Sequence, residues 1–279
     1  MKDQRKNNLY TICMAYLYTN DHVRLDYHEL GDPKGPTVIL IEGYSGNEMT
    51  WVGQIDPFIE AGFHLVTYDR RNHGKSQSVN YGMRIARHGY DLAELIDKVA
   101  FDQKVFLVGH SMGASTIFAY LSLFGCDHLK GIVTEDQSPK AINDQNWSLG
   151  LYDSDWDHLL AMAERIKKTK FTRLAVSRDF KIALGKVYRP FDFDFNQPLL
   201  LDSLVQDWRD QIETEKVPHL FLAGGNSPLW PKEEAQAAAA LNQRASFHIF
   251  QGAGHIPHLE KTDEFNQTVI DFIRNNQKR

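Results

Sequence analysis

The stretch that decides the fold is Lys104-Val105-Phe106-Leu107-Val108-Gly109-His110-Ser111-Met112-Gly113. Its apolar, partly β-branched run stops at Gly-His-Ser-Met-Gly, and a helical pattern with Ile117, Phe118 and Leu121 follows at once. This predicts a strand, a sharp turn with Ser111 at its apex, and a helix. The flanking glycines have a physical reason, because side chains there would collide with the adjoining strand and helix. The helix aims free N–H groups at the serine, which favours negative charge there.

Strand and helix patterns alternate on both sides of this turn. Strands are predicted at residues 15–19, 23–30, 37–41, 64–68, 104–108, 131–134, 219–223 and 246–250, and helices at 51–61, 83–99, 231–241 and 263–276. The first two strands have the pattern of an antiparallel hairpin, and the later alternation is typical of parallel strands. We therefore predict an α/β fold, with a mostly parallel twisted sheet of about eight strands flanked by helices.

The alternation is interrupted between residues 140 and 215, where the sequence is helical and rich in aromatic side chains and shows no buried-strand pattern. We interpret this segment as a helical lid inserted at the carboxyl edge of the sheet, where ligands bind in such folds. Residues 1–139 and 216–279 would then form the core. The alternatives are a separate small domain and a contact between copies of the chain.

Composition limits the class of protein. The chain has 279 residues, 42% hydrophobic and 24% charged, which is ordinary for a soluble domain of this size. A net charge of −5 and the lack of a basic stripe argue against nucleic acid as a partner. The broken apolar stretch 9–18 has no cleavage site and predicts a strand rather than a signal peptide. No run is long enough to span a membrane, and with two cysteines we expect a cytoplasmic protein.

A serine hydroxyl is a poor nucleophile unless a base accepts its proton, and the base is most often a histidine oriented by a carboxylate. The candidate is His255, which follows the last predicted strand in a glycine-rich loop. His258 in the same loop is the rival, and we expect it to bond or cap the loop backbone. His110, inside the turn, is predicted to pack beside the serine.

These segments together resemble the α/β-hydrolase fold family. The serine turn, residues 69–76 (similar to the family's D-x-R-G-x-G-x-S) and Gly254-His255-x-Pro257 occur in the family's order and spacing. The resemblance covers nearly the whole chain outside 140–215. It implies that Ser111 is the nucleophile, that His255 is the base, and that the backbone N–H groups of Met112 and Tyr44 form the oxyanion hole. The family usually has His-Gly-x in the Tyr44 loop, whereas this chain has Glu42-Gly43-Tyr44. This departure leaves open which residue supports the loop.

The position of the family's usual acid, after the seventh strand, holds Ser227 in this chain. Serine cannot carry the required negative charge, and the nearest carboxylates to the serine turn are Glu135 and Asp136 after the sixth strand. The chain is similar to small bacterial esterases that place an Asp three residues before a proline there and a serine at the usual acid position. This favours Asp136 as the acid, with Ser227 as a fourth, hydrogen-bonding member. Glu135, the choice by similarity to haloalkane-dehalogenase-like members, and a site without an acid are the alternatives.

The resemblance implies hydrolysis of small to medium carboxylic esters or thioesters through an acyl-enzyme, without metal or other cofactor. We expect Trp51, Trp230 and His110 to border an apolar substrate pocket. Alternatives with the same machinery are acyl transfer, cleavage of a C–C bond next to a carbonyl, and perhydrolysis. A ligand-binding, receptor-like member with vestigial turnover is a further alternative. The expected partner is a small-molecule ester, and both a monomer and a homodimer stay open.

Overall fold

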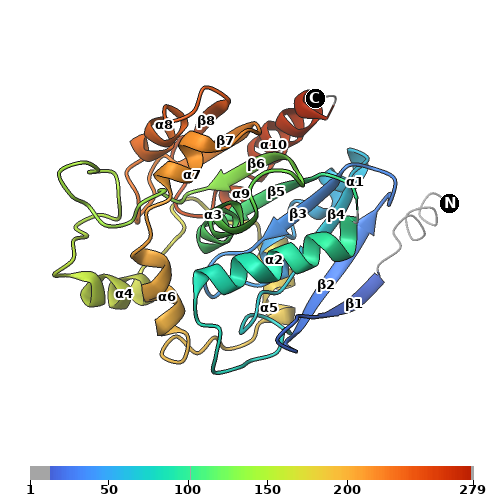
Figure 1. Ribbon diagram of the computed structural model, residues 1–279, viewed down its shortest axis with the longest axis horizontal. Coiled ribbons are helices and arrows are strands. Elements are labelled where there is room, and N and C mark those ends of the chain that lie inside the picture. The colour runs from blue at the N-terminus through green and yellow to red at the C-terminus, as the bar shows by residue number, and fades with distance from the viewer. Residues whose placement is uncertain (1–12, 101, 278–279) are drawn as a thin grey trace.

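The structure is a computed structural model that describes residues 13–100 and 102–277 (Figure 1). The described residues form one sheet of eight strands in the order β1-β2-β4-β3-β5-β6-β7-β8. The strands are β1 (Cys13–Tyr18), β2 (Arg24–Gly31), β3 (Thr37–Ile41), β4 (His64–Tyr68), β5 (Val105–His110), β6 (Leu129–Glu135), β7 (His219–Gly224) and β8 (Ala245–Phe250). β1 and β2 pair antiparallel, as does β2 with β4, and the others are parallel. The predicted fold class is confirmed, and the expectation for residues 9–12 lies outside the described residues.

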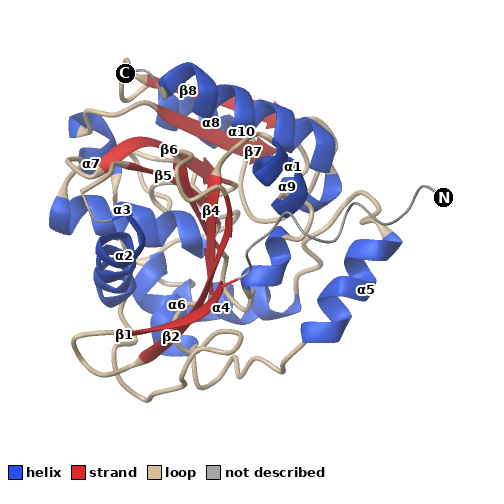
Figure 2. Ribbon diagram, turned by 90° about the vertical axis from the view of Figure 1, so that its right-hand side faces the viewer, coloured by secondary structure: helices blue, strands red, loops and turns tan. Residues whose placement is uncertain are grey.

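Helices cover both faces of the sheet, as Figure 2 shows. The helices of the core are α1 (Ile55–Glu60), α2 (Ile85–Ala100), α3 (Met112–Phe124), α8 (Glu233–Ala239), α9 (Pro257–Glu260) and α10 (Thr262–Asn276). Between β6 and β7 lie α4 (Leu159–Lys168), α5 (Arg178–Val187), α6 (Gln197–Leu204) and α7 (Arg209–Thr214). None of the described helices is both long and apolar enough to cross a membrane.

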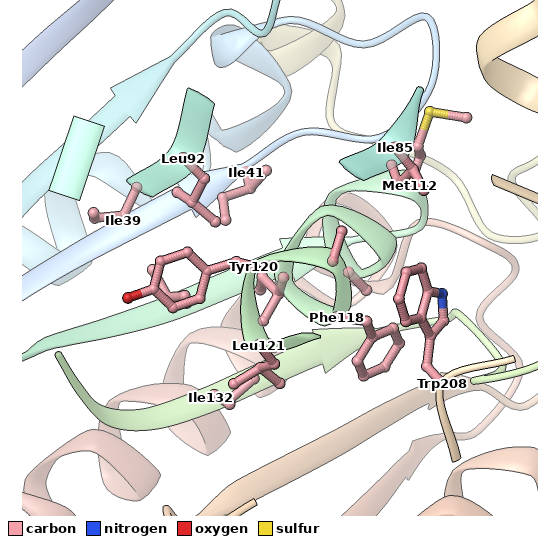
Figure 3. Packing of buried hydrophobic residues seen from close by; sticks show 14 of the residues in the cluster. Ile39, Ile41, Ile85, Leu92, Met112, Phe118, Tyr120, Leu121, Ile132 and Trp208 are labelled. Carbon is pink, nitrogen blue, oxygen red and sulfur yellow. The ribbon is translucent and has the colours of Figure 1, made fainter. Parts of the chain in front are cut away.

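The core divides into two apolar clusters because alternate strand residues point to opposite faces of the sheet. Ile39 and Ile41 of β3 pack with α2 and α3 on one face, and Leu40 packs with α1 and α10 on the other. Figure 3 shows the first cluster, in which Phe118 of α3 stacks on Trp208 just before α7. Strands buried on both sides explain the continuous apolar runs in the sequence.

One predicted element is wrong in detail. The helix expected over residues 51–61 is divided into a 3-10 turn, η1 (Glu48–Trp51), and the shorter α1. The Asn47 side chain caps η1 by accepting the Met49 N–H, which starts the turn earlier than the apolar pattern indicates. A Cβ on Gly53 would lie 2.9 Å from the Phe180 ring, so close packing of α5 uses a glycine where the helix was expected to continue. The short helix α9 was also not predicted.

Candidate active site

The turn between β5 and α3 holds Ser111 in a strained conformation, with φ 52° and ψ −121°. The neighbouring glycines allow this. A Cβ on Gly109 would lie 2.7 Å from the carbonyl carbon of Gly113, and one on Gly113 would lie 2.2 Å from the carbonyl oxygen of Ile41. Real side chains do not approach the backbone so closely, so the packing around this turn allows only glycine at both positions. The turn places Ser111 in the wall of a cavity.

His255 lies beside Ser111. Its Nε2 is 2.9 Å from the serine Oγ, across 144 residues of sequence. The loop that carries it passes very close to the end of β7, where a Cβ on Gly224 would lie 1.8 Å from the carbonyl oxygen of Gly254. The backbone N–H of His255 donates to the carbonyl of Phe171, at 2.9 Å. The imidazole is therefore held from both the core and the segment between β6 and β7.

Asp136 follows β6 and is fully buried. Its Oδ2 lies 2.6 Å from His255 Nδ1 and also accepts the Ser227 hydroxyl at 2.6 Å. Its Oδ1 accepts the backbone N–H of Gly224 at 2.7 Å. The structure thus brings Ser111, His255, Asp136 and Ser227 into one hydrogen-bonded chain, in the order Ser111–His255–Asp136–Ser227.

Glu135, the alternative acid, is turned away from His255. Its two oxygens meet His258, one accepting the backbone N–H at 2.8 Å and the other lying 2.7 Å from Nδ1. The backbone leaves the strand at Asp136, where φ is 49°, and the two neighbouring carboxylates face different histidines, Glu135 facing His258 and Asp136 facing His255. His258 is accordingly held by a side chain as well as by its own loop, a pair that sequence reasoning did not predict.

Trp51 is not a pocket residue, contrary to expectation. It is fully buried, and its ring stacks on His258 with centroids 4.2 Å apart. The prediction is wrong because the sequence does not distinguish an aromatic side chain that lines a pocket from one that packs behind it. Trp230 and His110 do line the cavity. His110 also contacts the loop of His255, whose carbonyl lies 2.8 Å from His110 Nε2.

The loop after β3 runs directly beside Ser111. A Cβ on Gly43 would lie 3.2 Å from the Cβ of Ser111, and Tyr44 and Met112 both line the cavity. Among the hydrogen bonds of the described residues, none uses the backbone N–H of Tyr44 or of Met112. These two donors are therefore available to a ligand next to the serine hydroxyl.

Glu42 supports this loop through Arg70. The fully buried carboxylate accepts the Arg70 backbone N–H at 2.9 Å and faces its Nε at 3.3 Å. The same guanidinium donates to the carbonyl of Gly43 at 2.9 Å. Sequence reasoning missed Arg70, although a carboxylate placed directly after a doubly buried strand requires a buried cation nearby.

Burial governs the ionisation of the groups around Arg70. It raises the pKa of Glu42, an effect that the guanidinium opposes. Burial and the charge of Arg70 lower the pKa values of His73 and His88 well below the usual range, which keeps both imidazoles neutral. Arg70 Nη2 lies 3.2 Å from His73 Nε2, so the neutral ring serves as an acceptor for the cation. Burial likewise lowers the pKa of His110.

The cavity beside Ser111 has a volume of about 200 Å³. Much of its wall comes from the segment between β6 and β7, which contributes the apolar side chains Leu151, Ile166, Phe171, Phe193, Leu200 and Leu204. Within the described residues, no group of three or more His, Cys, Asp or Glu side chains is placed to hold a metal ion.

Comparisons with known proteins identify the family and the fold. The family profile described as "alpha/beta hydrolase fold" matches residues 36–262. The chain is 26% identical to esterase YbfF of Escherichia coli over 244 residues, covering 85% of this chain and 92% of that protein. It is 22% identical to the bifunctional esterase/perhydrolase DCH of Acinetobacter calcoaceticus over 276 residues, covering 94% and 100%. An esterase structure from Exiguobacterium antarcticum superposes with a TM-score of 0.82 at 18% identity, covering 94% and 100%, a likeness of fold.

Proposed function

Because the chain belongs to the alpha/beta hydrolase fold family, we propose that it is a serine hydrolase that cleaves small to medium carboxylic esters or thioesters through an acyl-enzyme on Ser111. One observation carries the proposal. The Ser111 hydroxyl at the cavity wall lies 2.9 Å from His255 Nε2, and the other ring nitrogen of His255 lies 2.6 Å from a buried carboxylate. This is the geometry that nucleophilic catalysis by serine requires.

In the proposed reaction, His255 takes the proton of Ser111 as the serine Oγ attacks the ester carbonyl. The C–O bond to the alcohol breaks, and His255 returns the proton to the leaving oxygen. Water then repeats the sequence on the acyl-enzyme and releases the acid. Asp136 holds His255 with its proton on Nδ1, which leaves Nε2 free to accept. Ser227 and Gly224 donate to the two oxygens of Asp136 and hold the carboxylate in place.

The oxyanion of the tetrahedral intermediate is assigned to the backbone N–H groups of Met112 and Tyr44. Met112 is the first residue of α3, where backbone donors have no partner within the helix. Each donor of this kind is worth about 3–4 kcal/mol in the transition state. The Glu42–Arg70 pair fixes the Tyr44 loop, in the place of the histidine that the family usually has.

The acyl group is assigned to the apolar cavity, with residues 140–215 acting as a lid over it. A cavity of about 150 Å³ lined by apolar side chains holds a benzene ring. The cavity beside Ser111, at about 200 Å³, fits a benzoyl group or an acyl chain of similar size. Phe171 and Phe193 of the lid, together with Trp230 of the core, would contact that group.

Perhydrolysis is the second candidate, since one relative is named an esterase/perhydrolase. The acyl-enzyme would be the same, with hydrogen peroxide in place of water as the second nucleophile. The products separate the two, because only perhydrolysis yields a peracid. The assay would measure peracid and acid formed from one ester in the presence of peroxide.

The proposal is tested with p-nitrophenyl esters of increasing acyl length. Wild type should release p-nitrophenol with an optimum at short to medium acyl groups, and Ser111→Ala should lower the rate by about 10⁴-fold or more. Ser115→Ala is the matched control, because Ser115 is buried in α3 and its hydroxyl has no partner among the described residues. If no ester in the series gave a rate that depends on Ser111, the proposed function would be wrong.

A further inference from the structure

The charge of the chain is distributed very unevenly. Between residues 165 and 189 there are nine Lys and Arg side chains and one carboxylate, Asp179, which gives this segment a net charge of +8. The whole chain has a net charge of −5, so the rest of it carries −13. The expectation that the sequence lacks a basic stripe is therefore wrong locally, because an acidic total conceals a basic segment.

Most of these cations have no counter-ion among residues 13–100 and 102–277. Arg165 pairs with Asp153, and Lys167 pairs with Glu164 and Asp194. The other seven form no ion pair with any carboxylate in the part of the chain that the structure describes. We name these seven the basic surface: Lys168, Lys170, Arg173, Arg178, Lys181, Lys186 and Arg189. All seven side chains are exposed.

Helix α5 presents three of these cations on one outer face. Its inner face holds Phe180, which packs against Gly53, so the helix is anchored to the core beside η1. Arg178, Lys181 and Lys186 are exposed on the opposite side. Arg178 and Lys181, three residues apart, lie on neighbouring turns, and Lys186 is about two turns beyond Arg178, so the three side chains spread over one broad side of the helix. Figure 2 shows α5 at the margin of the molecule, away from the sheet, where its outer face is not covered by another described element.

Large apolar side chains project among the cations. Leu174 is 37% exposed, Ile182 47% and Tyr188 72%. The basic surface therefore combines seven positive charges with exposed aliphatic and aromatic groups, so it offers contacts to both anionic and apolar partners. A phosphate-rich polymer would satisfy only the charges, whereas a lipid interface satisfies both, because it has anionic headgroups above an apolar layer.

The basic surface is joined to the candidate active site. Phe171 lines the cavity, and its carbonyl accepts the backbone N–H of His255. Two residues on, the backbone N–H groups of Arg173 and Leu174 both donate to Glu260 at 2.6 Å. The segment that carries the charge therefore also forms a wall of the cavity.

We propose that the basic surface docks the protein onto membranes that contain anionic lipid, with Leu174, Ile182 and Tyr188 entering the interface. Docking in this orientation brings the cavity wall at Phe171 to the lipid. The proposal goes beyond ester hydrolysis and does not depend on it, since binding is measured without turnover. The acidic remainder of the chain is repelled by the same lipids, which fixes the side that approaches.

The test is flotation with vesicles of phosphatidylcholine alone and of phosphatidylcholine mixed with equal parts of phosphatidylglycerol. Wild type should float only with the mixed vesicles and should be released at high ionic strength. Each Lys or Arg near an anionic surface contributes about fivefold to partitioning, so Arg178→Gln/Lys181→Gln/Lys186→Gln should bind about 100-fold more weakly. The control, Lys34→Gln/Lys98→Gln/Arg244→Gln, removes three exposed cations outside the basic surface and should bind like wild type. Circular dichroism checks that both variants fold.

A second variant distinguishes a lipid surface from a soluble polyanion as the ligand of the basic surface. Leu174→Ser/Ile182→Ser/Tyr188→Ser should weaken vesicle binding and leave binding to heparin, a polyanion without an apolar layer, unchanged. The proposal is overturned if wild type does not float with mixed vesicles, or if the control loses as much binding as the α5 variant. The proposal is also overturned if Leu174→Ser/Ile182→Ser/Tyr188→Ser binds vesicles as wild type does, because the ligand of the basic surface would then be a polyanion in solution.

Discussion

At the scale of the residue, Asp136 is the point where three elements meet. It stands after β6, it receives the Gly224 N–H from the end of β7, and it faces His255 in the loop after β8. The Ser227 hydroxyl donates to the same carboxylate oxygen that faces His255. A carboxylate with this many donors has little freedom to rotate, which is what orienting an imidazole requires.

The first prediction concerns this carboxylate. Asp136→Asn should lower kcat by about 10⁴-fold, because the amide N–H would donate to His255 Nδ1 and move the imidazole proton to Nε2. Glu135→Gln should lower kcat by about tenfold or less, since Glu135 contacts His258 and not His255. Steady-state kinetics on one ester, with the melting temperature of each variant measured alongside, gives both numbers. The reverse ranking would assign the acid to Glu135.

The sequence allowed Asp136 to be chosen over its neighbour because the serine at position 227 and the proline at 139 formed a joint pattern. The same sequence could not place Trp51. Polar residues at strand ends indicate a functional site, whereas a tryptophan fits a pocket wall and the core equally well. The His258–Glu135 pair was missed because no sequence pattern links these two residues, whereas Asp136 and His255, which are about as far apart, each belong to a recognisable motif.

At the scale of the element, the loop after β3 depends on a buried ion pair. Arg70→Met alone leaves the Glu42 carboxylate buried without its cation, which should cost about 3–5 kcal/mol in the free energy of unfolding. Glu42→Leu/Arg70→Met removes both charges and should recover most of that stability. It also removes the donor to the Gly43 carbonyl, so we expect kcat about 10²-fold below wild type with KM little changed.

A second buried pair provides the matched control for that experiment. Arg71 and Asp91 join the loop after β4 to α2, with Nε and Oδ2 2.6 Å apart, and they do not contact Gly43. Arg71→Met/Asp91→Leu should therefore leave kcat close to that of wild type. Equal losses of kcat in the two double variants would show that Arg70 acts through general stability and not through the loop.

Elements differ in how well they could be predicted. β3 and β4 match their predicted bounds at 37–41 and 64–68, since short apolar runs rich in β-branched residues and bounded by turn residues favour doubly buried strands. The four helices between β6 and β7 could be predicted only as a helical segment. α5 buries none of its residues fully, and its position depends on contacts such as Phe180 with Gly53, which no sequence pattern shows.

At the scale of the whole molecule, buried carboxyls make stability depend on pH. Burial and the charges of Glu42 and Glu48 raise the pKa of Asp69 to about 7, whereas an unfolded chain has an Asp pKa near 4. Between about pH 4 and 7 the folded protein therefore holds a proton that the unfolded chain lacks. The contribution of Asp69 is full below pH 4 and is lost as the pH rises through 7.

Asp69→Asn should remove this component, because the amide stays neutral at every pH. The melting temperature of the variant should fall less than that of wild type between pH 5 and pH 8. Asp56→Asn, at an exposed position of α1, is the control and should follow wild type. Parallel curves for wild type and Asp69→Asn would show that Asp69 titrates at its ordinary pKa.

The spacing of Ser111 and His255 along the chain also bears on when a folding molecule assembles the candidate active site. Ser111 and His255 are 144 residues apart, and His255 stands beyond β8, the strand at the far edge of the sheet. Closing so long a loop costs entropy before any contact repays it. In the folded protein the loop of His255 follows β8, which pairs with β7, and β7 pairs with β6, so we expect the imidazole to reach Ser111 only when these strands are in place. Under the proposed function, hydrolysis therefore requires these pairings, and a collapsed, helix-containing intermediate that lacks them would show no activity in any assay.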